Sequence, residues 1–559
     1  MHPATRHATL AAACGFALVL AGCGRHVASN APITFAPADT PYLFANFKGT
    51  PTDVSRAWSQ ANATLLPVDI QQLGHFAERI GQKDPTAAKV LTALQAELAD
   101  VHSSADLEQT LGLSPSALFA IYGVGDVPVA RIELTSPDAF NAFWARVEKR
   151  AGVSTATASV DNQAYRVIGG IDGKLDFLVA IEGKQLVVTM APASASPDML
   201  KRLLGLAKPA SDAASRLADV NSRYGYGDYG SGYVDFLRLV ANLYDGKDQV
   251  TREFAKDLGG SLANPACASE FASLASKAPQ ASLGYTVNTA QERRASLDVQ
   301  LSPSLLGTLA ALKQPVPGMA DTSDQSVFDM VLALPLQKWQ AFIKGRAAAA
   351  ASKTYQCPAL QSLNKFAATA ANPPVQMPPE AASLLGFRVV LDKWDIGPRI
   401  AGRVLVASSD PAGLAQKIQQ TLPQFALKPI PTDGKPVSFQ LPPRVAALAG
   451  SGDQGWIVAN ASALALGIGA GEDSGTAGML TAAAGNGDTL LRMHFDGKVY
   501  PLLGSWMGRF AAMLPADKQA RMQRTVTAFN EMGKMIESAD VSVKLDDKGL
   551  HVVSDAKHR

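Results

Sequence analysis

The chain has 559 residues, of which 47% are hydrophobic and 18% are charged. This length exceeds what one hydrophobic core usually supports, so at least two domains are expected, and the composition argues against large-scale disorder. With 51 basic and 49 acidic residues, the overall field attracts neither nucleic acid nor a strongly charged polymer, so neither is expected as a partner.

The N-terminal stretch predicts a secretory signal peptide. A polar start with one cation precedes the apolar run LAAACGFALVLAG, which is shorter than the roughly 20 apolar residues that span a membrane. Leu20, Ala21, Gly22 and Cys23 then resemble a bacterial lipobox. The resemblance implies cleavage before Cys23 and acylation of that cysteine, and three acyl chains hold a protein on a membrane essentially permanently. The alternative is an ordinary signal peptide with a chance cysteine.

The residues after the cysteine predict a sorting signal and a flexible tether. By resemblance to lipoproteins of bacteria with two membranes, Gly24 in place of Asp implies sorting to the outer membrane, with the folded part facing the periplasm. The polar, unpatterned segment that follows predicts a flexible chain that places the folded part on the order of 25 Å from the bilayer. No later segment is expected to cross the membrane, because the most apolar candidate, WIVANASALALGIGAG, is interrupted by Asn460 and Ser462.

Two cysteines remain after the signal peptide and the lipid attachment site are set aside. Cys267 and Cys357 form an isolated pair in an oxidising compartment, which predicts a disulfide. The bond would close a loop of about 90 residues and contribute roughly 4 kcal/mol. Two separate buried thiols are the alternative.

The mature chain contains an internal repeat, in which similar sequence patterns recur about 260 to 285 residues apart. The stretches LFAIYGVGDVPVARIELTSPDAF and FRVVLDKWDIGPRIAGRVLVASSDPAGL both predict a hairpin followed by a helix. Ser136 before Pro-Asp and Ser409 before Asp-Pro supply capping oxygens, a fixed φ and a negative charge at the two helix starts. Apolar residues then fall at helical spacing: Phe140, Phe143, Trp144 and Val147 in one copy, and Leu414, Ile418 and Leu422 in the other.

This repeat predicts an α+β fold of two similar tandem lobes, each a mainly antiparallel sheet with helices on one face. The expected division is a signal peptide (1–22), a tether (23–40), a first repeat (41–312), a linker (313–325) and a second repeat (326–559). The two-copy pattern and its PADTPYLF start resemble a family of bacterial extracytoplasmic proteins of unknown function. That resemblance implies location and fold class, and it brings no catalytic residues.

The stretch YGYGDYGSGYVDF gathers four of the eleven tyrosines. Tyr224, Tyr226, Tyr229 and Tyr233 are a candidate binding surface, because an exposed row of tyrosines can stack on sugar rings or line a partner site. The alternative is a plain strand whose packing is relieved by glycine. The G-x-G-x-x-G string in the same stretch lacks the strand-then-helix context of a dinucleotide site.

No catalytic or metal-binding constellation is visible in the sequence. No histidines lie four residues apart, no cysteine lies at zinc spacing, and no serine sits in a nucleophile elbow, so no catalytic residue, metal or cofactor is expected. The C-terminal helix carries an apolar stripe at helical spacing, formed by Met522, Val526, Phe529, Met532 and Ile536. Such methionines fill an irregular core or repack around apolar ligands.

The first hypothesis is a non-enzymatic, membrane-anchored envelope lipoprotein with a binding or scaffold role and an envelope protein as a possible partner. The alternative, from another class, is a carrier of apolar cargo such as lipid in the periplasm. A cell-wall or carbohydrate-active enzyme is a third hypothesis and would need paired carboxylates in a cleft. A cavity lined by Leu, Val, Phe and Met between sheet and helices would favour the carrier, whereas a sheet sealed by packing would count against it.

Overall fold

The structure is a computed structural model. It describes residues 28–62, 70, 74, 77–78, 84–99, 101, 103–169, 175–245, 250–252, 264–320, 326–372, 378–394, 400–425, 427–449, 453–469, 471–511 and 515–559. The predicted signal peptide, Cys23 and the first part of the tether lie outside these residues. The chain divides into two compact units, Met1–Leu297 and Asp298–Arg559, which are described separately below as unit 1 and unit 2.

The sheet of unit 1 is antiparallel at every pairing from β4 to β9. Its strands follow the order β4-β5-β6-β7-β3-β2-β1-β8-β9. Their bounds are β1 Tyr42–Ala45, β2 Phe119–Val124, β3 Val127–Glu133, β4 Ala156–Val160, β5 Gln163–Ile168, β6 Leu175–Glu182, β7 Gln185–Pro192, β8 Ser231–Asp235 and β9 Gln280–Asn288. The next strand, β10 (Glu292–Val299), contains the boundary between the units.

Helices cover both faces of the central strands of unit 1. Its described helices are η2 Pro32–Phe35, α2 Thr52–Asn62, α4 Pro85–Leu98, α5 Ser104–Leu111, α6 Pro137–Ala151, α7 Pro197–Leu204, α8 Ala214–Tyr224, α9 Phe236–Asp245 and α11 Pro265–Ala275. On β2, Phe119 and Ile121 pack into one cluster with α4 and α6. Ala120 and Tyr122 point the other way, into a cluster with η2, α7 and α8. The helical cover of unit 1 therefore extends to both faces of its sheet.

Unit 2 repeats this strand order. Its strands run β14-β15-β16-β13-β12-β11-β17-β18-β19, all antiparallel. Their bounds are β11 Phe328–Ala333, β12 Leu384–Trp394, β13 Ile400–Ser408, β14 Val437–Gln440, β15 Gln454–Ala459, β16 Ala463–Ile468, β17 Thr489–Asp496, β18 Ile536–Leu545 and β19 Leu550–His558. The succession β5-β6-β7-β3-β2-β1-β8-β9 of unit 1 matches β14-β15-β16-β13-β12-β11-β17-β18. The predicted α+β fold of two similar lobes is confirmed.

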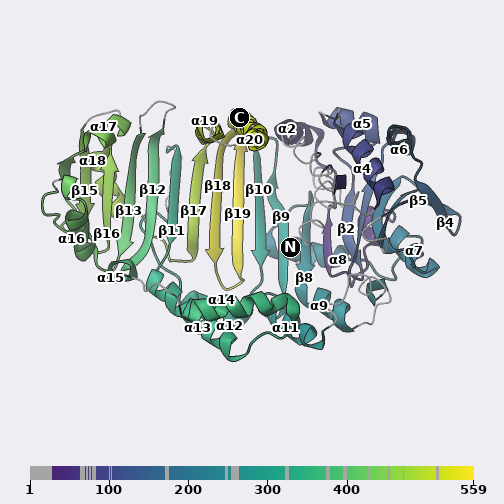
Figure 1. The fold of residues 1–559 in the computed structure, drawn as a ribbon, viewed down its shortest axis with the longest axis horizontal. Coiled ribbons are helices and arrows are strands. Elements are labelled where there is room, and N and C mark those ends of the chain that lie inside the picture. Colours follow the sequence, from purple (N-terminus) through teal and green to yellow (C-terminus); the bar gives the residue numbers. More distant parts are fainter. Residues whose placement is uncertain are drawn as a thin grey trace. The chain divides into compact units, whose positions relative to one another are not determined.

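The described helices of unit 2 gather at the ends of its strands and over its far edge. They are α12 Pro303–Ala310, α13 Leu336–Ser352, η4 Pro358–Leu360, α14 Gln361–Ala371, α15 Pro379–Ala382, α16 Pro411–Thr421, η5 Pro423–Phe425, α17 Pro443–Ala449, α18 Glu472–Thr481, α19 Val499–Ala511 and α20 Ala516–Met535. Figure 1 shows α13 and α14 side by side at one end of β11, β17 and β18, and α19 and α20 at the opposite end. No helix is drawn across the middle of these strands in that view.

The predicted helix starts of the repeat are present in both units. The Ser136 hydroxyl accepts a hydrogen bond from the Ala139 amide, 3.1 Å away, at the start of α6. In the second copy the cap is Asp410, whose carboxylate accepts from the Gly413 amide at 2.9 Å. The capping oxygen comes from Asp410 because Pro411 occupies the first helical position, directly after it.

The segment expected to be a linker, 313–325, differs from that expectation in its described part. Val316 and Met319 are buried in the core of unit 2, together with Val331 and Val390. These two apolar side chains attach residues 313–320 to the sheet. The boundary between the compact units accordingly falls earlier, after Leu297.

Candidate functional site

The predicted disulfide is present, whereas the predicted lipid attachment site lies outside the described residues. Cys267 and Cys357 are fully buried and disulfide-bonded to each other, which confirms the pairing expected from the sequence. Cys23 precedes residue 28, where the described chain begins, so its acylation stays a prediction.

The four tyrosines of the candidate binding surface do not share one exposed face. Tyr226 and Tyr233 are buried. The ring of Tyr226 lies directly over Gly284, where a Cβ atom would come within 2.4 Å of it, so this contact requires glycine. Tyr233 lies on β8 beneath the guanidinium of Arg216, which is 4.2 Å from its ring centroid.

The remaining two tyrosines are partly exposed. Tyr224 stacks on Tyr226, with 5.5 Å between ring centroids, and Tyr229 lies in the loop before β8. Gly225 ends α8 in the left-handed conformation, and the loop leads into a strand. This helix-then-strand order is the reverse of a dinucleotide-binding loop, in which a strand leads into a helix.

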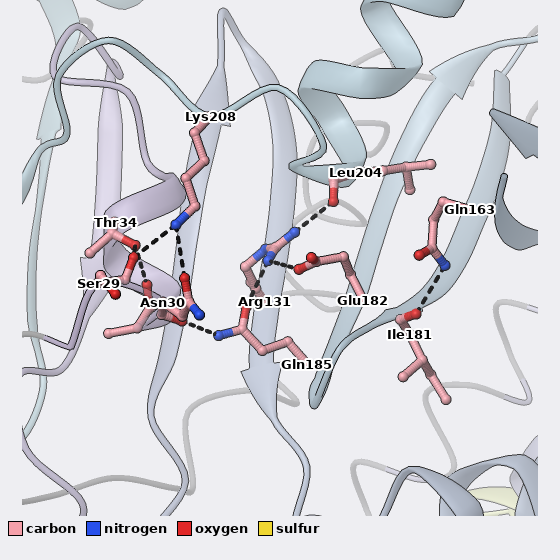
Figure 2. Close-up of polar contacts among 11 residues, drawn as sticks. Ser29, Asn30, Thr34, Arg131, Gln163, Ile181, Glu182, Gln185, Leu204 and Lys208 are labelled. Carbon is pink, nitrogen blue, oxygen red and sulfur yellow. Dashed lines mark hydrogen bonds and ion pairs between the residues drawn. The ribbon is translucent and has the colours of Figure 1, made fainter. Parts of the chain in front are cut away.

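A cavity of about 830 Å³ in unit 1 is lined by the β6–β7 turn, residues 182–185, and by Asn30 and Lys208 among others. Figure 2 draws Asn30, Glu182, Gln185 and Lys208 with their polar contacts. Arg131 of β3 is completely buried and contacts two of the residues that line the cavity, Glu182 and Gln185. One terminal nitrogen of Arg131 donates to Glu182 at 2.9 Å and Gln185 at 2.7 Å, and the other donates to the Leu204 carbonyl at 2.6 Å. The guanidinium also lies over the Phe35 ring, 3.6 Å from its centroid.

The same network fixes the N-terminal segment on the sheet. Gln185 donates to the Asn30 carbonyl at 2.6 Å, and the Lys208 ammonium donates to the Ser29 carbonyl at 2.8 Å. Figure 2 shows Lys208 above Ser29 and Asn30, with Arg131 directed toward Glu182 and Leu204. These bonds, together with the burial of Ile33 and Phe35, hold residues 29–35 against the sheet, so this part of the segment 23–40 is packed and is not the flexible tether expected from the sequence.

Two carboxylates line this cavity, as a carbohydrate-active enzyme would require. Burial raises the pKa of the Glu133 carboxyl, although the Leu118 amide opposes the shift by donating to it at 3.2 Å. Glu182 is held by Arg131. Beneath them, burial raises the pKa of Tyr122 to about 12 despite the nearby Arg131 charge, so its phenol stays protonated. The two carboxylates thus have separate structural partners.

The sheet of unit 2 buries its charged face. Asp329 of β11 is completely buried between two arginines. Arg388 donates to both carboxylate oxygens, at 3.0 and 2.9 Å, and Arg492 donates to one of them at 2.5 Å. His494 is buried on the neighbouring strand, with its Nδ1 2.9 Å from the Asp540 carboxylate.

The opposite face of the same strands is apolar and only partly buried. Residues alternate between faces along a strand, and directly paired residues share a face. The strand registers therefore place on one side the residues that we call the apolar face: Phe328, Met330, Leu332, Phe387, Val389, Leu391, Val404, Val406, Leu491, Met493, Phe495, Val541 and Val543. Every one of these side chains is half-buried or exposed.

The ends of the apolar face are partly covered by helices. Val499 and Leu502 of α19 pack near Phe328 and Phe495, whose rings lie 5.3 Å apart. This face was not among the candidate sites expected from the sequence. The signal was the strict alternation of apolar and polar residues in LRMHF, which identifies two faces without saying which one is covered.

Comparisons with known proteins give little support for any assignment. No protein-family model matches the chain, and no curated protein matches it. A solved structure titled "Structure of crystal form I of TP0453" is similar at 13% identity, over 50% of this chain and 81% of that chain, with a TM-score of 0.22. That score is too low to support an argument about fold or function.

None of the described helices combines the length and the apolar character needed to cross a bilayer. Within the described ranges, no group of three or more His, Cys, Asp or Glu side chains is arranged to hold a metal ion.

Proposed function

We propose that this protein is a lipid-anchored protein of the bacterial envelope whose second unit binds apolar cargo such as the acyl chain of a lipid. The observation that carries the proposal is that the sheet of unit 2 buries charged side chains on one face and leaves apolar side chains partly exposed on the other. Asp329, Arg388 and His494 are buried on one side of the sheet, while Phe, Met, Leu and Val side chains remain partly exposed on the other. Contiguous apolar surface of this kind is typical of a ligand-binding or interaction site.

The dimensions and chemistry of the apolar face suit an extended hydrocarbon chain. It covers β13, β12, β11, β17 and β18, five adjacent strands that at about 4.8 Å apart span about 19 Å. None of its residues is charged. Covering apolar surface gains roughly 25 cal/mol per Å² removed from water, so an apolar occupant would stabilise the unit.

A scaffold role, the other function expected from the sequence, would place a protein partner on the same face. The two functions differ in the chemistry of the occupant. A carrier binds free fatty acid or phospholipid in solution, whereas a scaffold binds a specific protein and has no affinity for isolated acyl chains.

The test is lipid binding by an unacylated Cys23→Ser chain, measured by fluorescent fatty-acid titration and native mass spectrometry. A charge at Val404, which is 39% exposed on β13 at one side of the face, should weaken binding by about tenfold or more, because cargo would have to cover an unpaired carboxylate. The variant is therefore Val404→Glu.

Leu237→Glu is the matched control, since Leu237 is 42% exposed and lies on α9 of unit 1. It should bind fatty acid as the parent does. Failure of the parent to bind any lipid, or equal binding by Val404→Glu, would contradict the carrier proposal. A photocrosslinker at position 404 that captured one protein in cells would then favour the scaffold.

A further inference from the structure

The helical hairpin formed by α13, η4 and α14, residues 336–372, has an unusual charge. Its sequence, LQKWQAFIKGRAAAAASKTYQCPALQSLNKFAATAAN, contains no Asp or Glu. It contains five cations: Lys338, Lys344, Arg346, Lys353 and Lys365. The whole chain carries a formal net charge of only +2, so positive charge is concentrated on this basic hairpin.

The basic hairpin also exposes large apolar side chains among these cations. Phe366 on α14 is 69% exposed, and Ile343 on α13 and Leu363 on α14 are exposed as well. Leu363 and Phe366 are three residues apart and therefore lie on the same side of α14. The residues buried on the two helices are small, Ala347 on α13 and Ala367 on α14. The hairpin thus packs through alanines and presents its large apolar side chains to solvent.

The hairpin is held in a defined conformation. The Asn364 side chain donates to the Tyr355 carbonyl and accepts from the Tyr355 amide, both at 2.8 Å, which fixes the loop between α13 and α14. Cys357 in the same loop is disulfide-bonded. At the N-terminal end, Lys338 donates to the Lys313 carbonyl at 3.2 Å. The exposed side chains are therefore displayed on a fixed support.

We propose that the basic hairpin is a membrane-docking surface that binds a bilayer carrying anionic lipids. Helices that lie on a membrane combine Lys and Arg with Phe, Leu or Trp, because the cations meet anionic headgroups while the apolar side chains enter the acyl boundary. Lys344 is adjacent to Ile343, and Lys365 to Phe366, so on both helices an exposed cation lies next to an exposed large apolar side chain. This surface is separate from the apolar face of unit 2 and does not depend on cargo binding.

A bilayer fits this surface better than a protein or a nucleic acid does. Five cations without one acid match a uniformly negative surface, whereas helices at protein interfaces usually carry both signs. A nucleic acid would leave the exposed Phe366 and Ile343 without an apolar environment. The anionic bilayer alone satisfies both the charge and the apolar side chains.

The test is co-flotation of the unacylated Cys23→Ser chain, which retains every described residue, with vesicles of defined composition. We expect binding to vesicles containing about one third phosphatidylglycerol, weaker binding at high salt, and little binding to pure phosphatidylcholine. The triple variant Lys344→Glu, Lys353→Glu, Lys365→Glu should bind at least about thirtyfold more weakly. Phe366→Ser should bind roughly tenfold more weakly.

The control is a second triple variant with the same change in net charge, Lys435→Glu, Lys498→Glu, Lys534→Glu, at exposed lysines outside the hairpin. It should bind within about threefold of the parent, because distant charges are screened. The proposal is overturned if the parent ignores anionic vesicles, if both triple variants lose binding equally, or if a photocrosslinker at position 366 captures protein instead of lipid. Fatty-acid binding should be unchanged in the hairpin variant, which separates this test from that of the cargo site.

Discussion

The two units share one strand order but differ in what covers the same face of the sheet. In unit 1, Phe119 and Ile121 of β2 are buried beneath α4 and α6. The equivalent residues of unit 2, Phe387 and Val389 of β12, are half-buried. Register fixes the equivalence, because Phe119 pairs with Ile132, four residues before the Ser136 cap, and Phe387 pairs with Val406, four residues before the Asp410 cap.

The difference comes from the helices between the first and second strands of each unit. In unit 1, α4 packs on α6 and buries Val90 and Leu98 against the sheet. In unit 2 the helix at the same place in the order, α14, packs on α13 and leaves Leu363 and Phe366 exposed. One repeat is therefore closed, and the other keeps an open apolar face. Shared topology does not decide which face of a sheet is covered.

The units also place their buried charges differently. In unit 1, Ala120 of β2 faces Arg131 of β3. At the equivalent pair of unit 2 the arginine lies on the other strand, where Arg388 of β12 faces Leu405 of β13. Arg131 is neutralised by Glu182 at the rim of the sheet, whereas Arg388 is neutralised by Asp329 within it. In unit 2, therefore, both partners of the buried ion pair lie on the buried face of the sheet.

The largest expected difference between the units is at the paired phenylalanines. Phe119→Ala should lower the free energy of unfolding by about 4 to 5 kcal/mol, because it leaves a cavity in a closed core. Phe387→Ala should lower it by only about 1 to 2 kcal/mol, because its side chain is already partly in water. Urea unfolding followed by circular dichroism measures both. Equal losses would show that the apolar face is as closed as its counterpart.

Part of this comparison could be predicted from the sequence. The repeat and the Ser136 cap follow from local sequence patterns, and the disulfide follows by elimination, because Cys267 and Cys357 are the two cysteines left over. The second helix start was also expected, but its cap is Asp410, one residue after the expected Ser409. The burial of Phe140, Phe143, Trp144 and Val147 on α6 follows from helical spacing.

The open face could not be predicted, because it depends on where α14 packs. Leu363 and Phe366 have the spacing of a buried stripe, as Val90 and Leu98 do on α4, and only the tertiary structure separates the two cases. The burial of Tyr226 could not be predicted from the tyrosine stretch, for a related reason. The glycine that accommodates Tyr226 is Gly284, which is far away in the sequence.

The second prediction concerns the disulfide, which joins one cysteine of each unit. The double variant Cys267→Ser, Cys357→Ser should lose about 4 kcal/mol, since opening a loop of about 90 residues restores entropy to the unfolded chain. Measurement of the unfolding midpoint with and without reductant checks this. The parent should lose its advantage on reduction, and the double variant should not respond.

The third prediction tests where the two units hold their buried counter-ions. Asp329→Asn should cost at least about 3 kcal/mol, because the carboxylate is 0% exposed and its loss leaves two arginines without their shared anion. Glu182→Gln should cost about 1 kcal/mol or less, because that carboxylate is 32% exposed and water screens the change. Reversal of this order would contradict the placement of charge described above.

The smallest expected effect is a difference in pH dependence between the units. Burial alone would lower the pKa of His551 in unit 2, but its hydrogen bonds to Asp298 and Asp546 outweigh burial and raise the pKa above 6.5. A raised histidine pKa contributes stability that is fully present below 6.5 and is lost as the pH rises through the folded-state value. In unit 1, burial raises the pKa of the Glu133 carboxyl above 4.5, so its contribution is present below 4.5 and begins to fall there.

The two units should therefore lose stability in different pH windows, unit 1 from about pH 4.5 upward and unit 2 from about pH 6.5 upward. Melting temperatures measured between pH 4 and pH 9 test this with two variants. His551→Gln should flatten the decline above pH 6.5 and leave the lower window unchanged, whereas Glu133→Gln should flatten only the lower window. If His551→Gln and the parent show the same slope above pH 6.5, the two aspartates do not hold the imidazolium in the folded state, because the proton would then bind equally well to the unfolded chain.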